Sequence, residues 1–192
     1  MSPTSSILVY DRRLFKIIYI SSDFHIGHYN IIKYCNRPFK TLEEMDNYII
    51  NNFKNTMKQN DIFYFLGDLA FGKENVIKIL EIIKNSGVEL NYIWGNHDKK
   101  YKNLIRPYCN SYSDYSEIKI KDQFIILSHY AIEDWNGRLH GSICLHGHSH
   151  NTLPQKKNRF DVCVDGSNFN ILSIEEILKR KDVINESRTK NQ

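Results

Sequence analysis

The chain has 192 residues, of which 41% are hydrophobic, and this size and composition fit one folded domain with one substantial core. Its net charge of +4 comes from 26 basic and 22 acidic residues, a balance too mild and too evenly spread for a dedicated nucleic-acid-binding protein. The four cysteines are far apart and form no CxxC pair, which excludes a cysteine-based structural zinc site and favours buried, reduced thiols.

Targeting and membrane segments are not expected. The first apolar run, residues 7–10, is cut off by charged residues and is too short for a secretory signal. Apolar residues never persist for the ~20 positions that a membrane-spanning helix needs. We therefore expect a soluble, cytoplasmic protein with one domain over residues 1–184 and a polar tail over residues 185–192.

The first half of the chain alternates predicted strands with predicted helices. β-Branched and aromatic residues favour buried strands over residues 15–20, 61–66 and 88–94. After a short helical piece around residues 30–34, Thr41 and Glu44 form a capping box that opens the next helix. Two long helices have apolar faces, formed by Leu42, Met45, Ile49 and Phe53 in the first and by Val76, Ile77, Leu80 and Ile83 in the second, which ends at Gly87. This order predicts parallel strands with right-handed crossovers.

The second half is predicted to contain short strands joined by turns and loops. They span residues 116–120, 124–128, 142–145 and 160–164, and their close succession favours mixed or antiparallel pairing. Ser173 and Glu176 would cap a closing helix whose Ile174, Ile177 and Leu178 face inward. Two sheets packed as a sandwich, with helices outside, fit this pattern.

Polar residues that can bind metals follow the predicted core strands. They are Asp23 and His25, Asp68, Asn96 with His97 and Asp98, His129, and His148 with His150. The carboxyl ends of strands meet at one edge of a sheet, so these side chains can face one ligand. Two neighbouring divalent cations need a shared carboxylate, and Asp68 stands alone on its turn. A single structural zinc is the alternative, although the set offers more donors than the four that it usually takes.

These motifs, in order and spacing, resemble the five sequence blocks of the calcineurin-like metallophosphoesterases. The blocks are Asp23-Phe24-His25, Gly67-Asp68, Gly95-Asn96-His97-Asp98, His129 and Gly147-His148-Ser149-His150. The segments Arg37-Pro38-Phe39, Trp135-Asn136-Gly137 and Asp161-Val162 also resemble the small bacterial and bacteriophage members. The resemblance implies an α/β fold, a four-layer α/β/β/α sandwich of two mixed β-sheets flanked by helices.

The resemblance also implies two divalent metal ions, with Mn²⁺ expected and Fe, Zn²⁺ or Ni²⁺ as alternatives. By the matching motifs, Asp23, His25, Asp68 and His150 would bind the first ion, and Asp68, Asn96, His129 and His148 the second. A metal-bridged hydroxide would attack the phosphorus, and His97 would protonate the departing alkoxide. Asp98 would orient His97 or cap the next helix, and the residues leave both roles open.

Two departures from the phosphatase pattern bear on the substrate. The second block lacks the Asp-Arg pair of the protein phosphatases, and the third block ends in Asp98 instead of glutamate. Both features resemble the phosphodiesterases and nucleases, so we expect hydrolysis of a nucleotide or nucleic-acid phosphodiester. The alternatives are a phosphomonoesterase acting on a nucleotide or nucleic-acid end, and a non-catalytic scaffold of the same fold. No membrane and no protein partner are predicted.

Substrate contacts are predicted for His28, Arg37, Trp135 and Arg138. Each has a structural alternative, which is a turn for His28, an ordinary surface position for Arg37, and a loop anchor for Trp135. His146 is expected in the core or in support of a ligand. Lys156, Lys157 and Arg159 form a basic cluster that fits a solvated hairpin tip better than a nucleic-acid contact.

Overall fold

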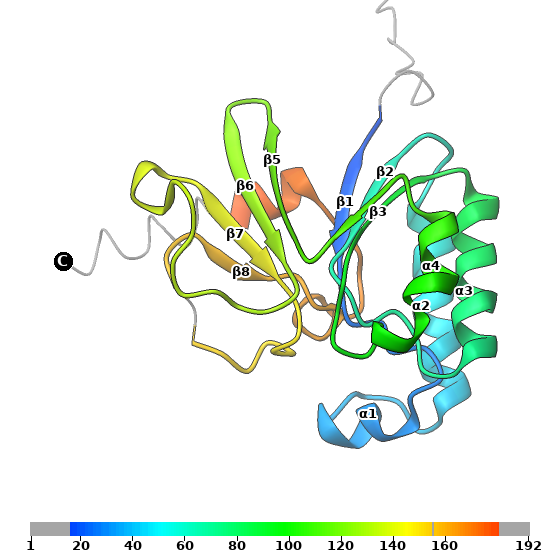
Figure 1. Cartoon of the computed structure of the whole chain (residues 1–192). Coiled ribbons are helices and arrows are strands. Elements are labelled where there is room, and N and C mark those ends of the chain that lie inside the picture. Colours follow the sequence, from blue (N-terminus) through cyan, green and yellow to red (C-terminus); the bar gives the residue numbers. More distant parts are fainter. Residues whose placement is uncertain (1–15, 155, 181–192) are drawn as a thin grey trace, which may run out of the picture.

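The computed structural model describes residues 16–154 and 156–180 and contains two β-sheets packed face to face (Figure 1). The predicted apolar run at residues 7–10 and the predicted tail at residues 185–192 lie outside the described residues. No helix in the described ranges combines the length and the apolar character that crossing a membrane requires.

The first sheet has the strand order β4-β3-β2-β1-β9. Its strands are β1 (Ile18–Ser21), β2 (Ile62–Phe65), β3 (Glu89–Ile93), β4 (Ser111–Ser113) and β9 (Leu172–Ser173). Strands β1 to β4 are parallel to one another, as the alternation of strands and helices predicts, and β9 pairs antiparallel with β1. Neither β4 nor β9 was predicted, because strands of three and two residues leave no periodic pattern.

Helices cover the outer face of this sheet. They are α2 (Leu42–Thr56), α3 (Lys73–Ser86) and the short α4 (Lys102–Ile105), while α1 (Tyr29–Tyr34) lies apart from them (Figure 1). Thr41 caps α2 by accepting the N–H of Glu44 at 3.1 Å. Gly87, with φ of 73°, ends α3 as predicted. The predicted face of α3 is wrong at Ile77, which is 38% exposed, because the helix turns Ile79 inward in its place.

The second sheet has the order β5-β6-β7-β8. Its strands are β5 (Tyr115–Ile120), β6 (Gln123–Ser128), β7 (Ile143–His146) and β8 (Arg159–Asp161). Strands β5 and β6 form an antiparallel hairpin, whereas β6, β7 and β8 are parallel, so both sheets are mixed, as predicted. The loop of residues 129–142, which includes the 3-10 helix η4 (Arg138–His140), follows β6 and places Trp135 against its outer face.

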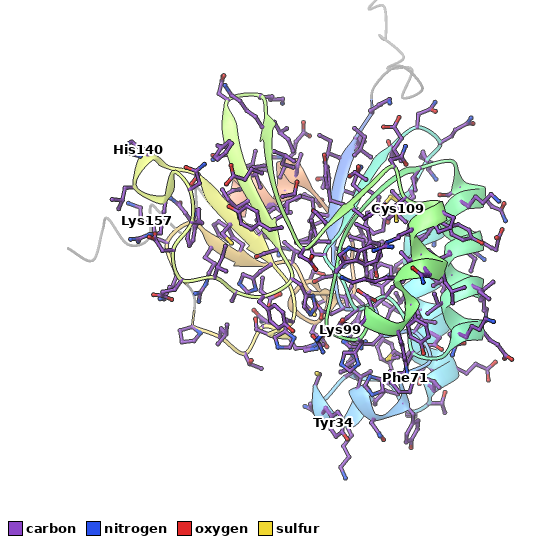
Figure 2. The ribbon with its side chains drawn as sticks, viewed as in Figure 1. Tyr34, Phe71, Lys99, Cys109, His140 and Lys157 are labelled. Carbon is purple, nitrogen blue, oxygen red and sulfur yellow. The ribbon has the colours of Figure 1, made fainter. Side chains whose placement is uncertain are left out.

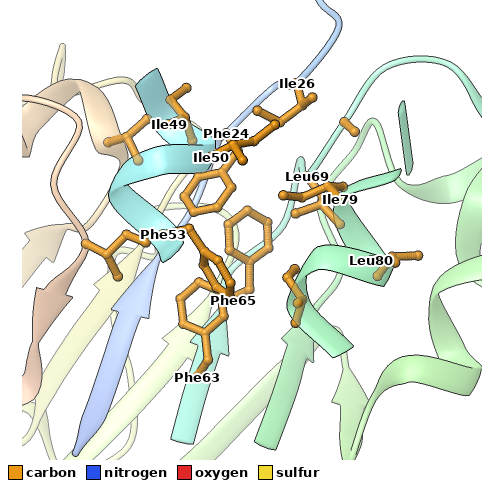
Figure 3. Close-up of a cluster of buried hydrophobic side chains, with 14 of the residues drawn as sticks. Phe24, Ile26, Ile49, Ile50, Phe53, Phe63, Phe65, Leu69, Ile79 and Leu80 are labelled. Carbon is orange, nitrogen blue, oxygen red and sulfur yellow. The ribbon is translucent and has the colours of Figure 1, made fainter. Parts of the chain in front are cut away.

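Two apolar layers hold these elements together. Alternate residues of the strands face opposite sides, so Ile20, Leu66 and Ile93 meet Ile125 and Leu145 between the sheets. On the other side, Phe63 and Phe65 pack against α2 and α3 (Figure 3). A helix over residues 174–180 closes the inter-sheet core with Ile174 and Ile177, and Ser173 and Glu176 form its predicted capping box. The sandwich thereby brings the carboxyl ends of β1, β2, β3, β6 and β7 to one edge.

Candidate metal centre

The predicted metal ligands come together at the carboxyl edge of the two sheets. Nε2 of His25 lies 3.7 Å from Oδ1 of Asp23 and 3.7 Å from Oδ2 of Asp68. On the other side of Asp68, Nε2 of His129 lies 3.5 Å from the same Oδ2. Nε2 of His150 lies 3.9 Å from Oδ1 of Asp23. These separations exceed hydrogen-bond length, and they suit donors arranged around shared cations.

Asp68 is common to two donor groups. One group joins it to His25 and His97, and the other joins it to His129 and His148, with all ligand atoms of a group within 4.8 Å of one another. Asn96 adds its Oδ1 at 2.9 Å from Nε2 of His129. A carboxylate shared in this way matches the bridging position that the sequence predicts for Asp68.

The backbone at these residues is strained. Positive φ angles occur at Asp23 (58°), His25 (53°), Asp68 (61°), His148 (64°) and His150 (46°). A non-glycine residue with positive φ is uncommon, and each such residue costs about 1–3 kcal/mol. Strain concentrated on the predicted ligands indicates that the loops are held in place to aim these side chains.

Two glycines make room for the buried carboxylates. A Cβ atom on Gly95 would lie 2.1 Å from Oδ1 of Asp68, and one on Gly147 would lie 2.3 Å from Oδ2 of Asp23. No side chain fits at these distances. The glycines of the third and fifth sequence blocks are therefore required by the close approach of the ligand loops.

The donor set fits divalent cations. Oδ1 of Asp23 and Nε2 of His25 are buried and have no hydrogen-bond partner among the described residues. Such orphan polar atoms are costly unless a ligand satisfies them. In the neutral ring that a metal ligand requires, Nδ1–H of His129 would donate to the carbonyl oxygen of Leu66 at 2.7 Å, which leaves Nε2 as the ligand atom on the side of Asp68.

The charges of these groups are balanced against one another. Burial alone would raise the pKa of Asp23, but the close approach of His25 and the charges of His129 and His150 lower that pKa strongly. Burial also opposes the charged form of His129, yet the carboxylates of Asp68, 3.5 Å away, and of Asp23 raise the pKa of His129 to about 9. Asp23 therefore stays ionised, and in the metal-free protein His129 is protonated beside the carboxylates.

Asp165, which the sequence analysis missed, orients His150. Its Oδ2 accepts a hydrogen bond from Nδ1 of His150 at 2.8 Å, which leaves Nε2 of His150 on the side of Asp23. Asp165 lies in the 3-10 helix η5 (Val164–Ser167), directly after the predicted strand at residues 160–164. Its position after a strand, like that of the other ligands, was the signal that could have revealed it.

The prediction that Arg37 contacts substrate is wrong. Arg37 is only 4% exposed, and its guanidinium donates to both carboxylate oxygens of Asp165, at 2.9 and 2.8 Å. The same group donates to the carbonyl oxygens of Asp23, at 2.8 Å, and of Phe24, at 3.0 Å. Arg37 therefore fixes the Asp23 loop and Asp165, and it has no free face for a phosphate.

Asp98 takes neither of its two predicted roles. It is 1% exposed, and its carboxylate accepts the backbone N–H groups of Gly95 at 2.8 Å, Asp68 at 2.9 Å and Leu69 at 3.3 Å. It makes no side-chain cap of the following 3-10 helix η2 (Lys99–Tyr101). Asp98 is a positioning residue for the ligand loops, because its oxygens are occupied by these amides and not by His97.

His97 and His28 lie beside the ligands. The His97 side chain is 37% exposed, and its backbone N–H donates to Oδ1 of Asp68 at 2.9 Å. The His28 ring stacks on Phe71 with centroids 4.9 Å apart and lies 5.7 Å from the His97 ring. Both rings are therefore placed to meet a substrate bound at the ligands. Figure 2 labels Phe71, the ring on which His28 stacks.

The predicted substrate contacts of Trp135 and Arg138 are wrong. Trp135 is 8% exposed and packs with Ile126 and Cys144, and its Nε1–H donates to Oγ of Ser142 at 3.1 Å. Arg138 pairs with Asp134 at 2.7 Å in η4, close to the start of β7 and therefore at the end of that strand opposite the ligands. The loop turns away from the proposed metal ligands soon after His129, so these two side chains do not line the ligand cluster.

Comparisons with known proteins agree with this geometry. Residues 17–170 match the family model of the calcineurin-like phosphoesterase superfamily domain. An uncharacterized protein of Methanocaldococcus jannaschii, MJ1445, is 35% identical over 169 residues, which cover 84% of this chain and 89% of that protein. The crystal structure of a protein of unknown function from Aquifex aeolicus, AQ665, superposes with a TM-score of 0.70 at 25% identity, covering 86% of this chain and 99% of that one. This chain belongs to the calcineurin-like phosphoesterase superfamily, whose characteristic chemistry is the metal-dependent hydrolysis of phosphoric esters.

Proposed function

We propose that the protein is a two-metal phosphodiesterase that hydrolyses a nucleotide or nucleic-acid phosphodiester. The observation that carries the proposal is the position of Asp68, which is shared between two groups of donors at one sheet edge. A single structural zinc would not need a carboxylate that faces histidines on both of its sides.

The ligands divide into two sets around Asp68. Asp23, His25 and His150 would complete the set on one side, and Asn96, His129 and His148 the set on the other. Divalent ions bound there, for which we propose Mn²⁺, would supply an activated water and offset the negative charge on the phosphoryl oxygens. The chain's own contribution is to hold these ligands rigidly through Arg37, Asp98 and Asp165.

His97 is proposed as the general acid. Its ring is partly exposed beside His25, with centroids 5.2 Å apart, while its backbone N–H is anchored on the proposed bridging carboxylate. The ring can therefore reach the leaving oxygen of an ester bound at the ligands. Donating a proton to that oxygen as the bond to phosphorus breaks would neutralise the developing alkoxide.

The preference for a diester follows from the shortage of guanidinium groups near the ligands. A monoester phosphate carries up to two negative charges and is typically held by bidentate arginine. Arg37 is already paired with Asp165, and the positions after Asp68 are taken by the buried apolar residues Leu69 and Ala70. A diester carries one negative charge and needs no such clamp.

The preference for a nucleotide rests on exposed aromatic rings around the ligands. Phe71 is 41% exposed and stacks on His28, and Tyr130 is 50% exposed with its ring 4.6 Å from that of His148. Solvent-exposed rings next to a phosphate site can stack on a base. They flank the ligands on two sides, at the ends of loops that follow β2 and β6.

Hydrolysis of two chromogenic esters tests the proposal. We expect Mn²⁺-dependent turnover of bis-p-nitrophenyl phosphate with higher kcat/KM than that of p-nitrophenyl phosphate. His97→Ala should lower kcat by about 10²–10⁴-fold without loss of bound metal, because its role is proton transfer. Asp68→Ala should lose metal together with activity, measured as metal content of the purified protein.

His140→Ala is the matched control, since His140 is exposed in η4 at the other end of β7 and should leave turnover unchanged. Absence of metal-dependent turnover of either ester would overturn the proposed activity. A preference for the monoester would overturn only the diesterase assignment. Cyclic nucleotides, dinucleotides and single-stranded oligonucleotides then identify the natural substrate class.

A further inference from the structure

A second cavity lies behind the loop that carries His148 and His150. It has a volume of about 170 Å³ and is bounded by β8, by residues 151–154 and 156, and by the closing helix of residues 174–180. A cavity of about 150 Å³ is large enough to hold a benzene ring. The ligand cluster at the carboxyl edge is a different site, because none of the proposed metal ligands lines this cavity.

The lining of this cavity has an apolar part and a cationic part. Phe160, Leu172 and Ile177 belong to the apolar part, which suits a ring. Three cationic side chains line the same cavity, Lys156, Arg159 and Arg180. Arg159 is 8% exposed, and its nearest carboxylate oxygen, on Glu133, is 3.5 Å away.

Asp161, the lone carboxylate in the lining, makes no ion pair with these cations. Asp161 uses Oδ2 to accept the hydroxyl of Ser149 at 2.6 Å and the N–H of Asn151 at 2.8 Å, and it uses Oδ1 to accept the N–H of Cys163 at 2.8 Å. Its oxygens are thus engaged by the backbone and by the ligand loop. Glu133 pairs with Lys156 and lies beside Arg159, whereas Arg180 makes no ion pair with another described residue and is available to an anion.

A buried histidine adds an unused hydrogen-bonding atom. His146 is 2% exposed and lines the cavity, and its Nδ1 lies 2.9 Å from the carbonyl oxygen of Gly147, to which it donates. Its Nε2 has no hydrogen-bond partner among the described residues. This ring nitrogen is free to form a hydrogen bond with a ligand in the cavity.

We propose that this cavity binds a small ring-bearing organic anion and that its occupancy tightens metal binding at the ligand cluster. The ring would lie on Phe160 and Ile177, and the acid group would pair with Arg159 and Arg180. The link to the metals is Asp161, which lines the cavity and at the same time holds Ser149 and Asn151, the residues that flank His150. A ligand that fixes Asp161 would fix the His148–His150 loop in its metal-binding form.

Three small probes separate the parts of this proposal. Phenylphosphonate carries a ring and an anion, methylphosphonate an anion without a ring, and benzyl alcohol a ring without an anion. Each is titrated into the full-length Zn²⁺-loaded protein while the methyl NMR signals of Leu172 and Ile177 are followed. We expect saturable shifts with phenylphosphonate and at least tenfold weaker shifts with the other two. The shifts should be lost in Arg180→Gln, and the Leu172 shift should be lost in Ile177→Phe, which fills the cavity.

Arg138→Gln is the matched control for the loss of one exposed arginine and should bind phenylphosphonate like the wild type. A parallel titration of the metal-free protein with Zn²⁺, in the presence of each phosphonate, measures the Zn²⁺ dissociation constant, which we expect phenylphosphonate to lower by about fivefold or more relative to methylphosphonate. The methylphosphonate arm accounts for phosphonate bound at the metals themselves.

Equal shifts with all three probes, or unchanged shifts in both cavity variants, would overturn the cavity as an anion site. Binding without any change in Zn²⁺ affinity would overturn the link to the ligand loop. Neither readout depends on hydrolysis, so both stand apart from the test of the proposed phosphodiesterase.

Discussion

The carboxylate of Asp98 lies beneath the loop of Asp68 and accepts the backbone N–H groups of Asp68 at 2.9 Å and Leu69 at 3.3 Å. It also accepts the N–H of Gly95 at 2.8 Å, so one buried side chain joins the loops that follow β2 and β3. The proposed bridging ligand is therefore held from below by a residue that cannot itself reach a metal. Substituting Asp98 therefore tests how the ligand loops are held in place, without removing a proposed metal ligand or the proposed general acid.

We expect Asp98→Asn to weaken both folding and metal binding. The amide can still accept one or two of the N–H groups, but its NH₂ would face another N–H, and an unsatisfied buried group costs about 1–3 kcal/mol. Metal affinity should fall by about 10–100-fold, as for other changes that misorient a ligand. Urea unfolding and metal titration measure the two effects. Asp114→Asn, at a side chain that is 84% exposed, is the control, and an unchanged metal affinity in Asp98→Asn would refute the positioning role.

Arg37→Lys tests whether Arg37 supports the fold or binds phosphate. Lysine cannot make the two parallel hydrogen bonds to Asp165, so we expect a loss of about 3–5 kcal/mol in the free energy of unfolding. At saturating metal, KM for bis-p-nitrophenyl phosphate should stay within about twofold of the wild type. A large rise in KM with unchanged stability would show instead that the guanidinium contacts the substrate.

Most of the ligand cluster was predictable because it follows from strand ends. A buried strand can be identified from β-branched and aromatic residues, and parallel strands bring their carboxyl ends to one edge, so the positions of Asp23, Asp68 and His129 follow from order alone. The positive φ angles of the ligands are not encoded in any residue type here. They become visible only when the loops are seen packed against one another.

The wrong predictions share a physical cause. Arg37 was assigned to the substrate as a phosphate clamp, and Trp135 because its segment links two strands of the site, but neither reason says which way the side chain turns. Arg37 turns inward to Asp165, which is 128 residues away, and Trp135 turns onto the outer face of the second sheet. Such long-range pairs carry no periodic signal, so the sequence alone does not show that Asp165 is the partner of Arg37.

The metal-free protein should become less stable as the pH rises above neutrality. Burial opposes the charge on His150, but its hydrogen bond to Asp165 raises the pKa of His150 from 6.5 to about 10, and the pKa of His129 is raised to about 9. A raised histidine pKa stabilises the fold fully below pH 6.5, and this stabilisation is lost as the pH rises through the folded-state pKa. Melting temperatures in EDTA should therefore fall between pH 7 and about pH 10.

Bound metal should reverse this trend. Metal ligands must be deprotonated histidines, so metal affinity should rise over the same pH range in which the metal-free fold weakens. Asp165 acts at low pH. Burial opposes the charge on its carboxylate, but the hydrogen bond to His150 favours that charge and lowers the pKa of Asp165 to about 2. The stability that the ionised carboxylate contributes is therefore lost as the pH falls below the ordinary value of 3.8. A melting temperature in EDTA that stays flat from pH 7 to pH 9.5 would contradict the ion pairing described for His150 and His129.

Gly147→Ala should abolish metal binding with a folded chain. The added Cβ would lie 2.3 Å from Oδ2 of Asp23, so the carboxylate or the loop must move, and the buried ligand set would lose its geometry. Gly141→Ala is the control, because its Cβ would meet nothing within 4 Å and only its φ of 89° adds strain, at about 1–2 kcal/mol. Metal content and circular dichroism are measured for both variants. Full metal content in Gly147→Ala would contradict the prediction, because it would show that the loop can shift away from Asp23 without loss of the metal-binding geometry.

Phe71→Ala and Tyr130→Ala test whether the exposed rings recognise a base. Stacking of a base on an aromatic side chain is worth about 1–3 kcal/mol, so each variant should lose about 5–150-fold in kcat/KM for a dinucleotide. Turnover of methyl p-nitrophenyl phosphate, which has no base, should change by less than about twofold, because neither ring is among the metal ligands. Tyr48→Ala, at a ring on α2 that is 45% exposed, is the matched control and should affect neither substrate. Equal losses on both substrates would mean that the rings support His28 and His148 instead of a base, because Phe71 stacks on His28 and Tyr130 lies against His148.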